Sequence, residues 1–494
     1  MNTRFLFPAL LALVTILRWL WLAPQDLTPT GAYLALCGYS PSVAYFDGPG
    51  GAAVCTALGT RWAGAGALGA ALLWPVFALL ATVALYHLVA PLAGPRSATA
   101  AAVLLNLLPA FNTAAVNPTC ALPLTLCALA FAGCAWRALD AESLAWWFAA
   151  GLCAAAGLLF DYLAWFFLPA LLVVMLSSHR WRARLRGPGF WLAALTPLAV
   201  FTWLLAWNAG HSWVHFISGT WQTATTLRLS ALPSALSAAS AGASPLVLVV
   251  LAAAVLFGLR EARTSRQAKF LALPAVLAAL IALYLALRDE PASAAGLAAA
   301  ALALPLLARL PVPPLLFAAV WLSAAVWGAV TLASHRPAAP SITPAVVREI
   351  ESLRTAQADG SSAPVFLIAR DAALASALAL HLPDTSFVAP GHPPVYVVES
   401  PHADSQYALW PRYDQFVEAP KPAEEDAPDP FTEQDGANPF IGRSALYISA
   451  QTPDQLPQAV TAAFAAHRLL AEITAPSGEI LRIYLCRNYE TLPL

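Results

Sequence analysis

The chain has 494 residues, of which 59% are apolar and only 11% are charged. A soluble protein of this size carries about 25% charged residues and needs them to cover its surface. The composition therefore excludes an entirely water-soluble protein and indicates that lipid surrounds much of the chain.

Apolar runs long enough to cross a bilayer recur through the first two thirds of the chain, where about 20 residues make one crossing. Eleven runs are expected to span, at about 5–23, 67–90, 98–116, 119–137, 144–160, 162–177, 189–207, 245–259, 270–287, 294–309 and 314–333. One bent helix over 144–177 is an alternative to two. The first run is interpreted as a retained span, because Arg18 interrupts it and no signal-peptide cleavage site follows.

Charge divides the chain into two parts. Residues 1–340 hold 17 Lys and Arg against 8 Asp and Glu, whereas residues 341–494 hold 9 against 19. This change predicts a transmembrane domain over 1–338 and a water-soluble domain over 339–494. The soluble part has no basic stripe interleaved with aromatic residues, so nucleic-acid binding is not expected.

Basic residues alternate between the loops of the first part. They gather in every second loop, at Arg96, Arg137, Arg180, Arg182, Arg184, Arg186, Arg260, Arg263, Arg266, Lys269 and Arg309. With eleven spans, the positive-inside rule then predicts a multi-pass protein of the plasma (inner) membrane. Its N-terminus would be cytoplasmic and its C-terminal domain periplasmic or otherwise extracytoplasmic.

The C-terminal domain is expected to be a small α/β fold. Strand-like runs fall at 364–369, 394–399, 443–450 and 479–488, and helical patterns fall near 371–381 and 453–472. The seven cysteines of the chain include no CxxC pair. They are interpreted as small buried residues rather than as ligands of a metal or partners in disulfides.

Few acids are expected on the outer side of the membrane domain, and each is a candidate for function because ionisable groups near the bilayer are costly. They are Asp26, Asp47, Asp161, Asp289 and Glu290. The last two adjoin Arg288 in a short loop and are interpreted as solvated.

Two outer segments read as helix starts. Thr28 before Pro29, and Asn117 before Pro118, each place a capping residue ahead of a proline. Helix N-termini that face one cavity favour anions such as a lipid phosphate, although ordinary capping explains the same pattern.

These segments carry a resemblance to a known family. The motifs, in order, are Asp26-Leu-Thr-Pro-Thr-Gly-Ala-Tyr33, Ala44-Tyr-Phe-Asp-Gly-Pro49, Asn117-Pro-Thr119, Phe160-Asp-Tyr162, Arg186-Gly-Pro-Gly189, Trp207-Asn-Ala-Gly-His-Ser-Trp213, and in the tail Ala375–Leu380 and Gln406–Pro411. Together they resemble glycosyltransferase family 39, which includes protein O-mannosyltransferases and the aminoarabinose transferase of lipid A. The resemblance implies a GT-C fold.

The family resemblance also implies an activity. Its members transfer a hexose or pentose from a polyprenyl-phosphate sugar to an acceptor on the outer face of the membrane, and a divalent metal assists in some of them. A carboxylate of the first outer loop acts as general base, and Asp47 is the family acid retained here. The acceptor can be a lipid, a glycan or a protein.

The resemblance also gives a set of candidate substrate-binding residues. They are Asp26, Tyr33, Tyr45, Asp161, Tyr162, Trp207, Asn208, His211 and Trp213. Other interpretations stay open for some of the candidates. Asp47 begins the sequence Asp-Gly-Pro-Gly-Gly, which is typical of a turn, so Asp47 could simply cap that turn. His211 and His215 are four residues apart and could share a metal or lie at the membrane interface, where tryptophans also anchor.

The chain departs from the family pattern at five positions. Thr30, Gly31 and Thr119 stand where the family has acids or an acid-containing motif, Asp161 stands where it has a lysine, and Gly48 stands where it has a histidine. Two hypotheses follow: an active transferase that relies on Asp47, Asp26 or Asp161, and a catalytically silent relative that binds a lipid-linked sugar or a partner. A transporter would call for internal inverted repeats, which the sequence does not display.

Overall fold

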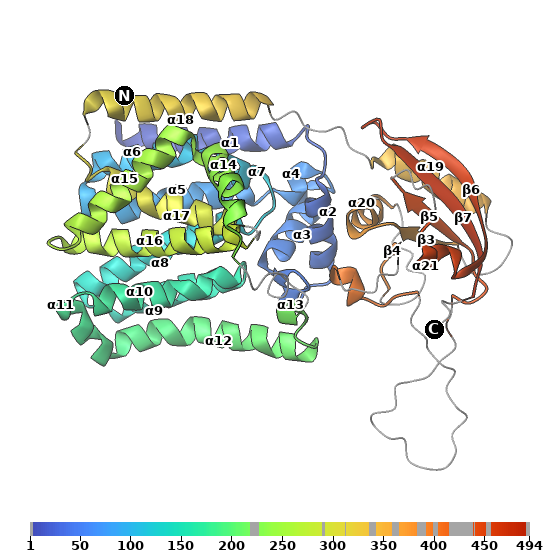
Figure 1. Ribbon diagram of the computed structural model, residues 1–494, viewed down its shortest axis with the longest axis horizontal. Coiled ribbons are helices and arrows are strands. Elements are labelled where there is room, and N and C mark those ends of the chain that lie inside the picture. Colours follow the sequence, from blue (N-terminus) through green and yellow to red (C-terminus); the bar gives the residue numbers. More distant parts are fainter. Residues whose placement is uncertain are drawn as a thin grey trace, which may run out of the picture. The chain divides into compact units, whose positions relative to one another are not determined.

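The computed structural model describes residues 3–217, 227–288, 292–311, 313–334, 342–357, 365–382, 392–398, 404–413, 438, 440–450 and 456–490. The chain forms two compact units (Figure 1). The first contains residues 1–25 and 38–336, and the second contains residues 26–37 and 337–494. The predicted division at 338 thus omits one feature, since residues 26–37 group with the C-terminal unit.

The first unit is helical. Its helices are α1 (Thr3–Leu22), α3 (Gly51–Ala63), α4 (Ala67–Ala70), α5 (Trp74–Ala93), α6 (Pro95–Leu107), α7 (Pro109–Val116), α8 (Ala121–Ala141), α9 (Leu144–Leu158), η1 (Tyr162–Phe166), α10 (Phe167–Leu176), α11 (His179–Arg182), η2 (Ala183–Arg186), α12 (Pro188–Gly210), α13 (Val214–Ile217), η3 (Leu229–Ala231), α14 (Leu232–Ala243), α15 (Pro245–Glu261), α16 (Arg266–Leu287), α17 (Ser293–Leu307) and α18 (Pro314–Ser334). Every predicted span falls on one of these helices or on a bent pair of them, and 144–177 is two helices.

Not every helix is long enough to cross a membrane unaided. Within the described residues, four are long and apolar enough, namely Ala67–Ala93, Ala121–Ala141, Pro188–Gly210 and Arg266–Leu287. Six qualify if each of two bent pairs counts as one span. Shorter apolar helices fall on the remaining predicted runs. The arrangement is that of a polytopic membrane protein.

One predicted span, 98–116, is broken by proline, and a second bend comes just before the predicted span at 245–259. The helices α6 and α7 meet at 67°, and η3–α14 meets α15 at 99°. Pro109 and Pro245 open the second helix of each pair. Proline has no N–H to donate, and it disfavours helical backbone in the residue before it. Pro109 is visible in the sequence, but the apolar run 98–116 continues through it and was therefore predicted as one helix.

Arg18, which interrupts the first apolar run, bridges α1 to the break between α6 and α7. Its guanidinium donates to Oδ1 of Asn106 at 3.0 Å and of Asn112 at 2.8 Å. Asn112 in turn donates to the backbone oxygens of Asn106 and Leu108. A broken helix in an apolar setting needs such partners for its freed carbonyls.

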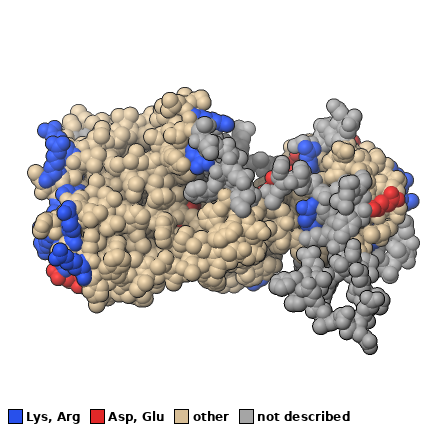
Figure 2. Space-filling view, turned by 60° about the horizontal axis from the view of Figure 1, so that its bottom comes forward, with Lys and Arg blue, Asp and Glu red and all other residues tan. Residues whose placement is uncertain are grey.

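The charged side chains of the first unit are concentrated at one end. Figure 2 shows Lys and Arg gathered there, with few charges over the rest of the visible helical surface. The arginine-rich α11 and η2 lie at this end in Figure 1. This clustering agrees with the alternation of basic loops along the sequence.

The second unit is a small α/β fold, as predicted. Its elements are α2 (Pro29–Tyr39, of which 29–37 belong here), α19 (Pro344–Ala356), β3 (Phe366–Ala369), α20 (Ala372–His381), β4 (Tyr396–Val397), η4 (Gln406–Ala408), β5 (Ala445–Ser449), α21 (Gln458–Thr461), β6 (Phe464–Thr474) and β7 (Ile480–Tyr489). The sheet order is β4-β3-β5-β7-β6. Strand β3 pairs in parallel with β4 and β5, whereas β7 pairs antiparallel with β5 and β6.

One predicted element of this unit is wrong. The segment 453–472 was expected to be helical, but its described part contains only the short α21 and then the long strand β6. The alanines, leucines and Arg468 of β6 are good helix formers. Backbone pairing with β7 from Phe464↔Tyr489 to Thr474↔Ile480 overrides that preference.

Candidate active site

Asp47 lies at the tip of a tight hairpin in the first unit. Strands β1 (Ala44–Tyr45) and β2 (Gly48–Pro49) pair antiparallel with Tyr45 opposite Gly48, so Phe46 and Asp47 form the turn. Gly48 has φ of +138°, a conformation that side chains rarely adopt. Asp47 is exposed, whereas Phe46 and Gly48 beside it are buried. Asp47 therefore lies in a turn, as its neighbours in sequence indicate, and its carboxylate is also exposed.

Tyr45 holds the base of this hairpin. Its side chain is buried, and its hydroxyl donates to the oxygen of Ser40 at 3.0 Å and accepts from the backbone N–H of Ser42 at 3.1 Å. The N–H of Gly50 donates to the oxygen of Val43 at 2.8 Å. These bonds give Tyr45 a structural task, and its predicted contact with substrate stays a prediction.

Asp161 lies in the break between α9 and η1. Its Oδ1 accepts a hydrogen bond from the backbone N–H of Leu163 at 2.9 Å, which caps η1. The side chain is half-buried. Burial raises the pKa of Asp161 to about 6, against the opposing effect of the hydrogen bond from Leu163.

The hairpin and the Asp161 break are fastened together. The N–H of Gly51 donates to the oxygen of Leu159 at 2.7 Å. A Cβ at position 51 would lie 2.5 Å from that oxygen and 3.0 Å from a ring carbon of Phe160. Only glycine allows α3 to begin this close to the end of α9.

Cys120 connects the two acids to the start of α8. Its thiol lies near the carboxylates of both Asp161 and Asp47. The start of α8 is also linked to Phe160, since Trp74 packs on Phe77 and Phe77 packs on Phe160 with ring centroids 5.9 and 5.8 Å apart. The backbone oxygen of the neighbouring Thr119 accepts from Nε1 of Trp74 at 3.0 Å. Three segments that are distant in sequence thus converge, as an active site requires.

The end of α12 supplies a fourth segment. Asn208 is fully buried, and its Nδ2 donates to the hydroxyl of Tyr162 at 3.1 Å and to the oxygen of Leu204 at 3.0 Å. Its Oδ1 is buried and has no hydrogen-bond partner among the described groups. Ser212 and Trp213 follow with φ of +55° and +56°. Strained backbone of this kind concentrates at functional sites.

The two histidines of this segment differ. His211 is exposed, stacks on Trp207 with ring centroids 4.0 Å apart, and places Nδ1 2.8 Å from the oxygen of Trp207. His215 instead packs against Tyr162 with ring centroids 4.7 Å apart and places Nδ1 3.3 Å from the oxygen of Phe46. His215 was not among the predicted site residues. The spacing of four residues between His211 and His215 was visible in the sequence, but only the structure shows that their surroundings differ.

Asp26 and Tyr33 belong to the second unit. The hydroxyl of Tyr33 accepts from the backbone N–H of Gln406 at 2.8 Å, and its ring packs on the core of that unit. The charge of Asp26 favours protonation of His381, although burial lowers the pKa of that histidine overall. Both residues thus have partners in the C-terminal unit, and their predicted contact with substrate is untested.

The two predicted helix starts have different outcomes. Thr28 caps α2 as expected, since its Oγ1 accepts from the N–H of Gly31 at 3.1 Å. The prediction at Asn117 and Pro118 is wrong, because α7 ends there and α8 begins at Ala121. Asp289 and Glu290 lie outside the described residues.

The acids do not form a metal site by themselves. Among the described residues, no group of three or more His, Cys, Asp or Glu side chains lies close enough to hold a metal ion. A metal held by fewer protein ligands would need others from a substrate, as Mg²⁺ often does with phosphates.

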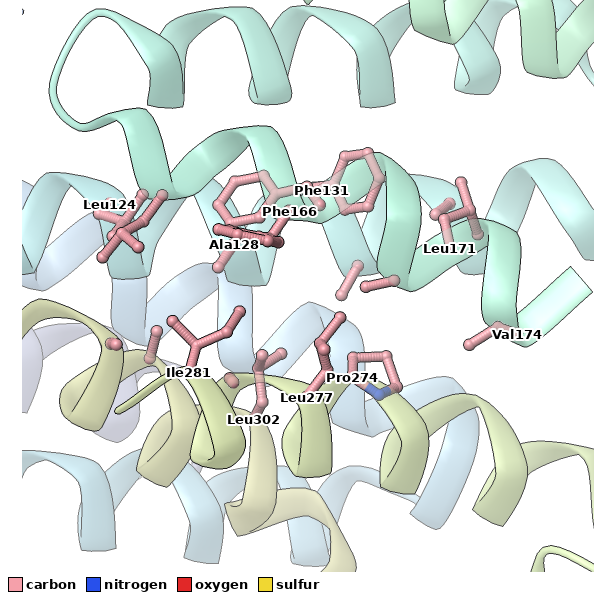
Figure 3. A pocket seen from close by; sticks show the side chains of 18 of the residues that line it. Leu124, Ala128, Phe131, Phe166, Leu171, Val174, Pro274, Leu277, Ile281 and Leu302 are labelled. Carbon is pink, nitrogen blue, oxygen red and sulfur yellow. The ribbon is translucent and has the colours of Figure 1, made fainter. Parts of the chain in front are cut away.

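An apolar cavity lies within the helices of the first unit (Figure 3). Its open mouth included, it contains about 690 Å³ of space that no atom occupies. Only apolar residues line it, and they come from α8, η1, α10, α16 and α17. Leu124 and Leu163 are among them, one turn after Cys120 and two residues after Asp161. Cys120 and Asp161 therefore each lie within one turn of a cavity residue along the chain.

Fold and site together define a polytopic membrane protein with the GT-C fold, as the family resemblance implies. Residues 47–207 match the family model described as dolichyl-phosphate-mannose-protein mannosyltransferase. The matched region begins at Asp47 and includes Cys120, Asp161 and Tyr162. No curated protein sequence matches the chain significantly.

Solved structures give the same fold. ArnT from Cupriavidus metallidurans, bound to undecaprenyl phosphate, is similar to this chain with a TM-score of 0.63 at 14% identity, over 98% of each chain. Its apo state gives the same values. The archaeal oligosaccharyltransferase AglB from Archaeoglobus fulgidus, in complex with an inhibitory peptide and a dolichol-phosphate, covers 76% of this chain and 64% of its own with a TM-score of 0.51 at 11% identity.

Proposed function

We propose that this protein transfers a sugar from a polyprenyl-phosphate donor to an acceptor on the outer face of the membrane, with Asp47 as the general base. One observation carries the proposal: the bond from Gly51 to Leu159 fastens the Asp47 hairpin to the break that holds Asp161, and a wholly apolar cavity begins two residues beyond Asp161. A polyprenyl-phosphate sugar has the matching chemistry, with a polar head and a long apolar tail. Structures similar to this one include an ArnT bound to undecaprenyl phosphate.

The reaction assigns one task to each part. Asp47 accepts the proton of the acceptor hydroxyl as that oxygen bonds to the anomeric carbon of the sugar, and the bond from that carbon to the phosphate oxygen breaks. The leaving group is the polyprenyl phosphate, whose tail the apolar cavity holds. The exposed position of Asp47 leaves it accessible to an acceptor, and general-base catalysis needs the carboxylate within about 3 Å of the hydroxyl.

A divalent metal fits this arrangement only with help from the substrate. Asp161 would be its protein ligand, and oxygens of the donor phosphate would complete the coordination. Such an ion would supply positive charge to the leaving phosphate, which Asp161 cannot do in place of the family's lysine. Treatment with a chelator, followed by Mg²⁺ or Mn²⁺, is expected to lower and then restore turnover.

Turnover by the Asp47→Asn variant tests the proposal. The full chain in nanodiscs would receive undecaprenyl-phosphate mannose or aminoarabinose, and release of undecaprenyl phosphate would be measured. Loss of a positioned base is expected to lower the rate by about 10²–10⁴-fold. Asp140→Asn is the matched control, since Asp140 is exposed in the last turn of α8, the end away from Cys120. Full activity of Asp47→Asn would eliminate Asp47 as the base.

A catalytically silent relative is the second candidate, favoured by Thr30, Gly31, Thr119 and Asp161 at the positions where the family pattern differs. It would retain polyprenyl phosphate through purification and turn over neither donor. Narrowing the cavity with Leu277→Trp separates the two functions, because it should remove bound lipid in both cases but should remove turnover only from an active enzyme.

A further inference from the structure

His215 is held where the chain reverses after α12. The N–H groups of His211 and Trp213 both donate to the oxygen of Asn208, at 3.1 and 2.7 Å, and close the helix end. Ser212 and Trp213 then adopt the left-handed conformation. The short helix α13 follows, so that His215 does not continue the face of α12 that carries His211.

His215 contacts both neighbours of Asp47 in the hairpin turn. Its Nδ1 lies 3.3 Å from the backbone oxygen of Phe46. On the other side of the turn, a Cβ at Gly48 would lie 3.5 Å from Cε1 of His215, an ordinary van der Waals contact. The imidazole therefore lies against the backbone that sets the direction of the Asp47 carboxylate.

The opposite side of the ring is also held. Tyr162 packs against His215, and the hydroxyl of Tyr162 receives the hydrogen bond from the fully buried Asn208. Phe216 packs on the other edge of Tyr162, with ring centroids 5.8 Å apart. Asn208, Tyr162 and His215 form a series of contacts that ends at the turn, and we name them the turn clamp.

The electrostatics favour a neutral imidazole that donates. Burial lowers the pKa of His215, while the bond to Phe46 and the charge of Asp47 oppose that shift. A neutral ring with its proton on Nδ1 satisfies the carbonyl of Phe46 and leaves Nε2 as an acceptor. His211 does not share this setting, because it is exposed and stacked on Trp207.

We propose that His215 is a positioning residue that fixes the Phe46–Asp47 turn and so places Asp47 for proton transfer. The inference rests on the proposed function for its effect on rate, but the clamp itself is a claim about the turn. Misplacing a reacting group by about 1 Å can cost about 10²-fold in rate. A loosened turn should therefore lower kcat while donor binding in the apolar cavity persists.

Three variants test the proposal kinetically. His215→Phe keeps a ring against Tyr162 but removes the donor to Phe46, and it should lower kcat about 10²-fold with the donor KM changed less than about 3-fold. His215→Gln retains an N–H donor and should recover part of the loss. His179→Phe is the matched control and should be nearly silent, because His179 is exposed on α11, at the opposite end of the first unit from α13 in Figure 1. In the Asp47→Asn background, His215→Phe should add no further loss, whereas an independent role would multiply the two effects.

Hydrogen exchange of residues 44–51 tests the clamp without any turnover. His215→Phe should speed exchange in this segment, where the N–H of Gly50 is bonded to Val43, and His179→Phe should not. Faster exchange in a protein that has no turnover would support the clamp and contradict the proposed function. Unchanged exchange, with either normal or reduced kcat, would overturn the positioning role of His215.

Discussion

The segment between the first two predicted spans contains two stretches that the sequence presents as one motif region. Residues 26–37 group with the C-terminal unit, where Tyr33 and Leu36 pack on an apolar core. Residues 43–51 group with the helical unit, where they form the hairpin and the start of α3. Both contain an acid, but Asp26 has His381 as a neighbour whereas Asp47 shares the surroundings of Cys120 with Asp161.

This difference shows that nearness in sequence is a poor guide to a shared site. The resemblance placed Asp26, Tyr33, Tyr45 and Asp47 together as functional candidates. The structure gives three of them partners that explain their positions, and it leaves Asp47 on an exposed turn. If the two stretches have separate tasks, substitutions in one should leave the other unaffected.

The largest expected effect on stability comes from the hairpin side. Gly51→Ala would place a Cβ 2.5 Å from the backbone oxygen of Leu159, so α3 and α9 must separate. We expect a loss of about 1–3 kcal/mol in the free energy of unfolding, with reduced turnover. Thermal melting in detergent measures it. Gly296→Ala is the control, because a Cβ there meets nothing within 4 Å. An unchanged melting temperature for Gly51→Ala would contradict the close approach.

A smaller effect should follow from the pH dependence of Asp161. Its pKa in the folded protein is about 6, above its ordinary value of 3.8. Between these values the folded state holds a proton that the unfolded chain has released, so stability should fall as pH rises from about 4 to 7. Asp161→Asn removes the titration and still accepts from Leu163. The variant should therefore gain melting temperature relative to wild type as pH rises, and a constant difference would show that Asp161 is well solvated.

The smallest effect is expected from Tyr33→Phe. It removes the acceptor for the N–H of Gln406 and should cost about 1 kcal/mol in the stability of the second unit. Turnover that depends on Asp47 should stay within about 2-fold of wild type. Tyr39→Phe is the counterpart in the first unit, where its hydroxyl bonds to Thr60. Hydrogen exchange of residues 404–410 measures the change in stability. A large loss of turnover in Tyr33→Phe would contradict the division, because it would show that residues 26–37 also contribute to the activity.

Much of the fold follows from the sequence because lipid imposes a simple rule. A long run without charge must satisfy its backbone internally, and so the apolar runs became helices. The bend at Pro109 was missed because the apolar run 98–116 continues through it, whereas the predicted span at 245–259 already began at Pro245. Strand β6 was missed for a different reason, since pairing with β7 outweighed the helix preference of its residues.

The site was predictable only residue by residue. Asp47 and Asp161 were identified as rare acids, but their approach to Cys120 depends on how α3, α8 and α9 begin and end. His215 carried no motif of its own, and its contact with Phe46 joins residues 169 positions apart. No local pattern records a contact of that range, and family motifs directed attention to His211 instead.

The division of the second unit between two distant parts of the chain also has a consequence for biosynthesis. Residues 26–37 leave the ribosome long before β7 is made. Tyr33 packs against a core to which β7 contributes. At about 5–20 residues per second, this segment waits for tens of seconds. During that interval Tyr33, Leu36 and Cys37 have no core to enter, so the nascent chain depends on its surroundings to keep them from misassembly. The C-terminal unit cannot mature as an autonomous late domain, since its first helix was made near the beginning.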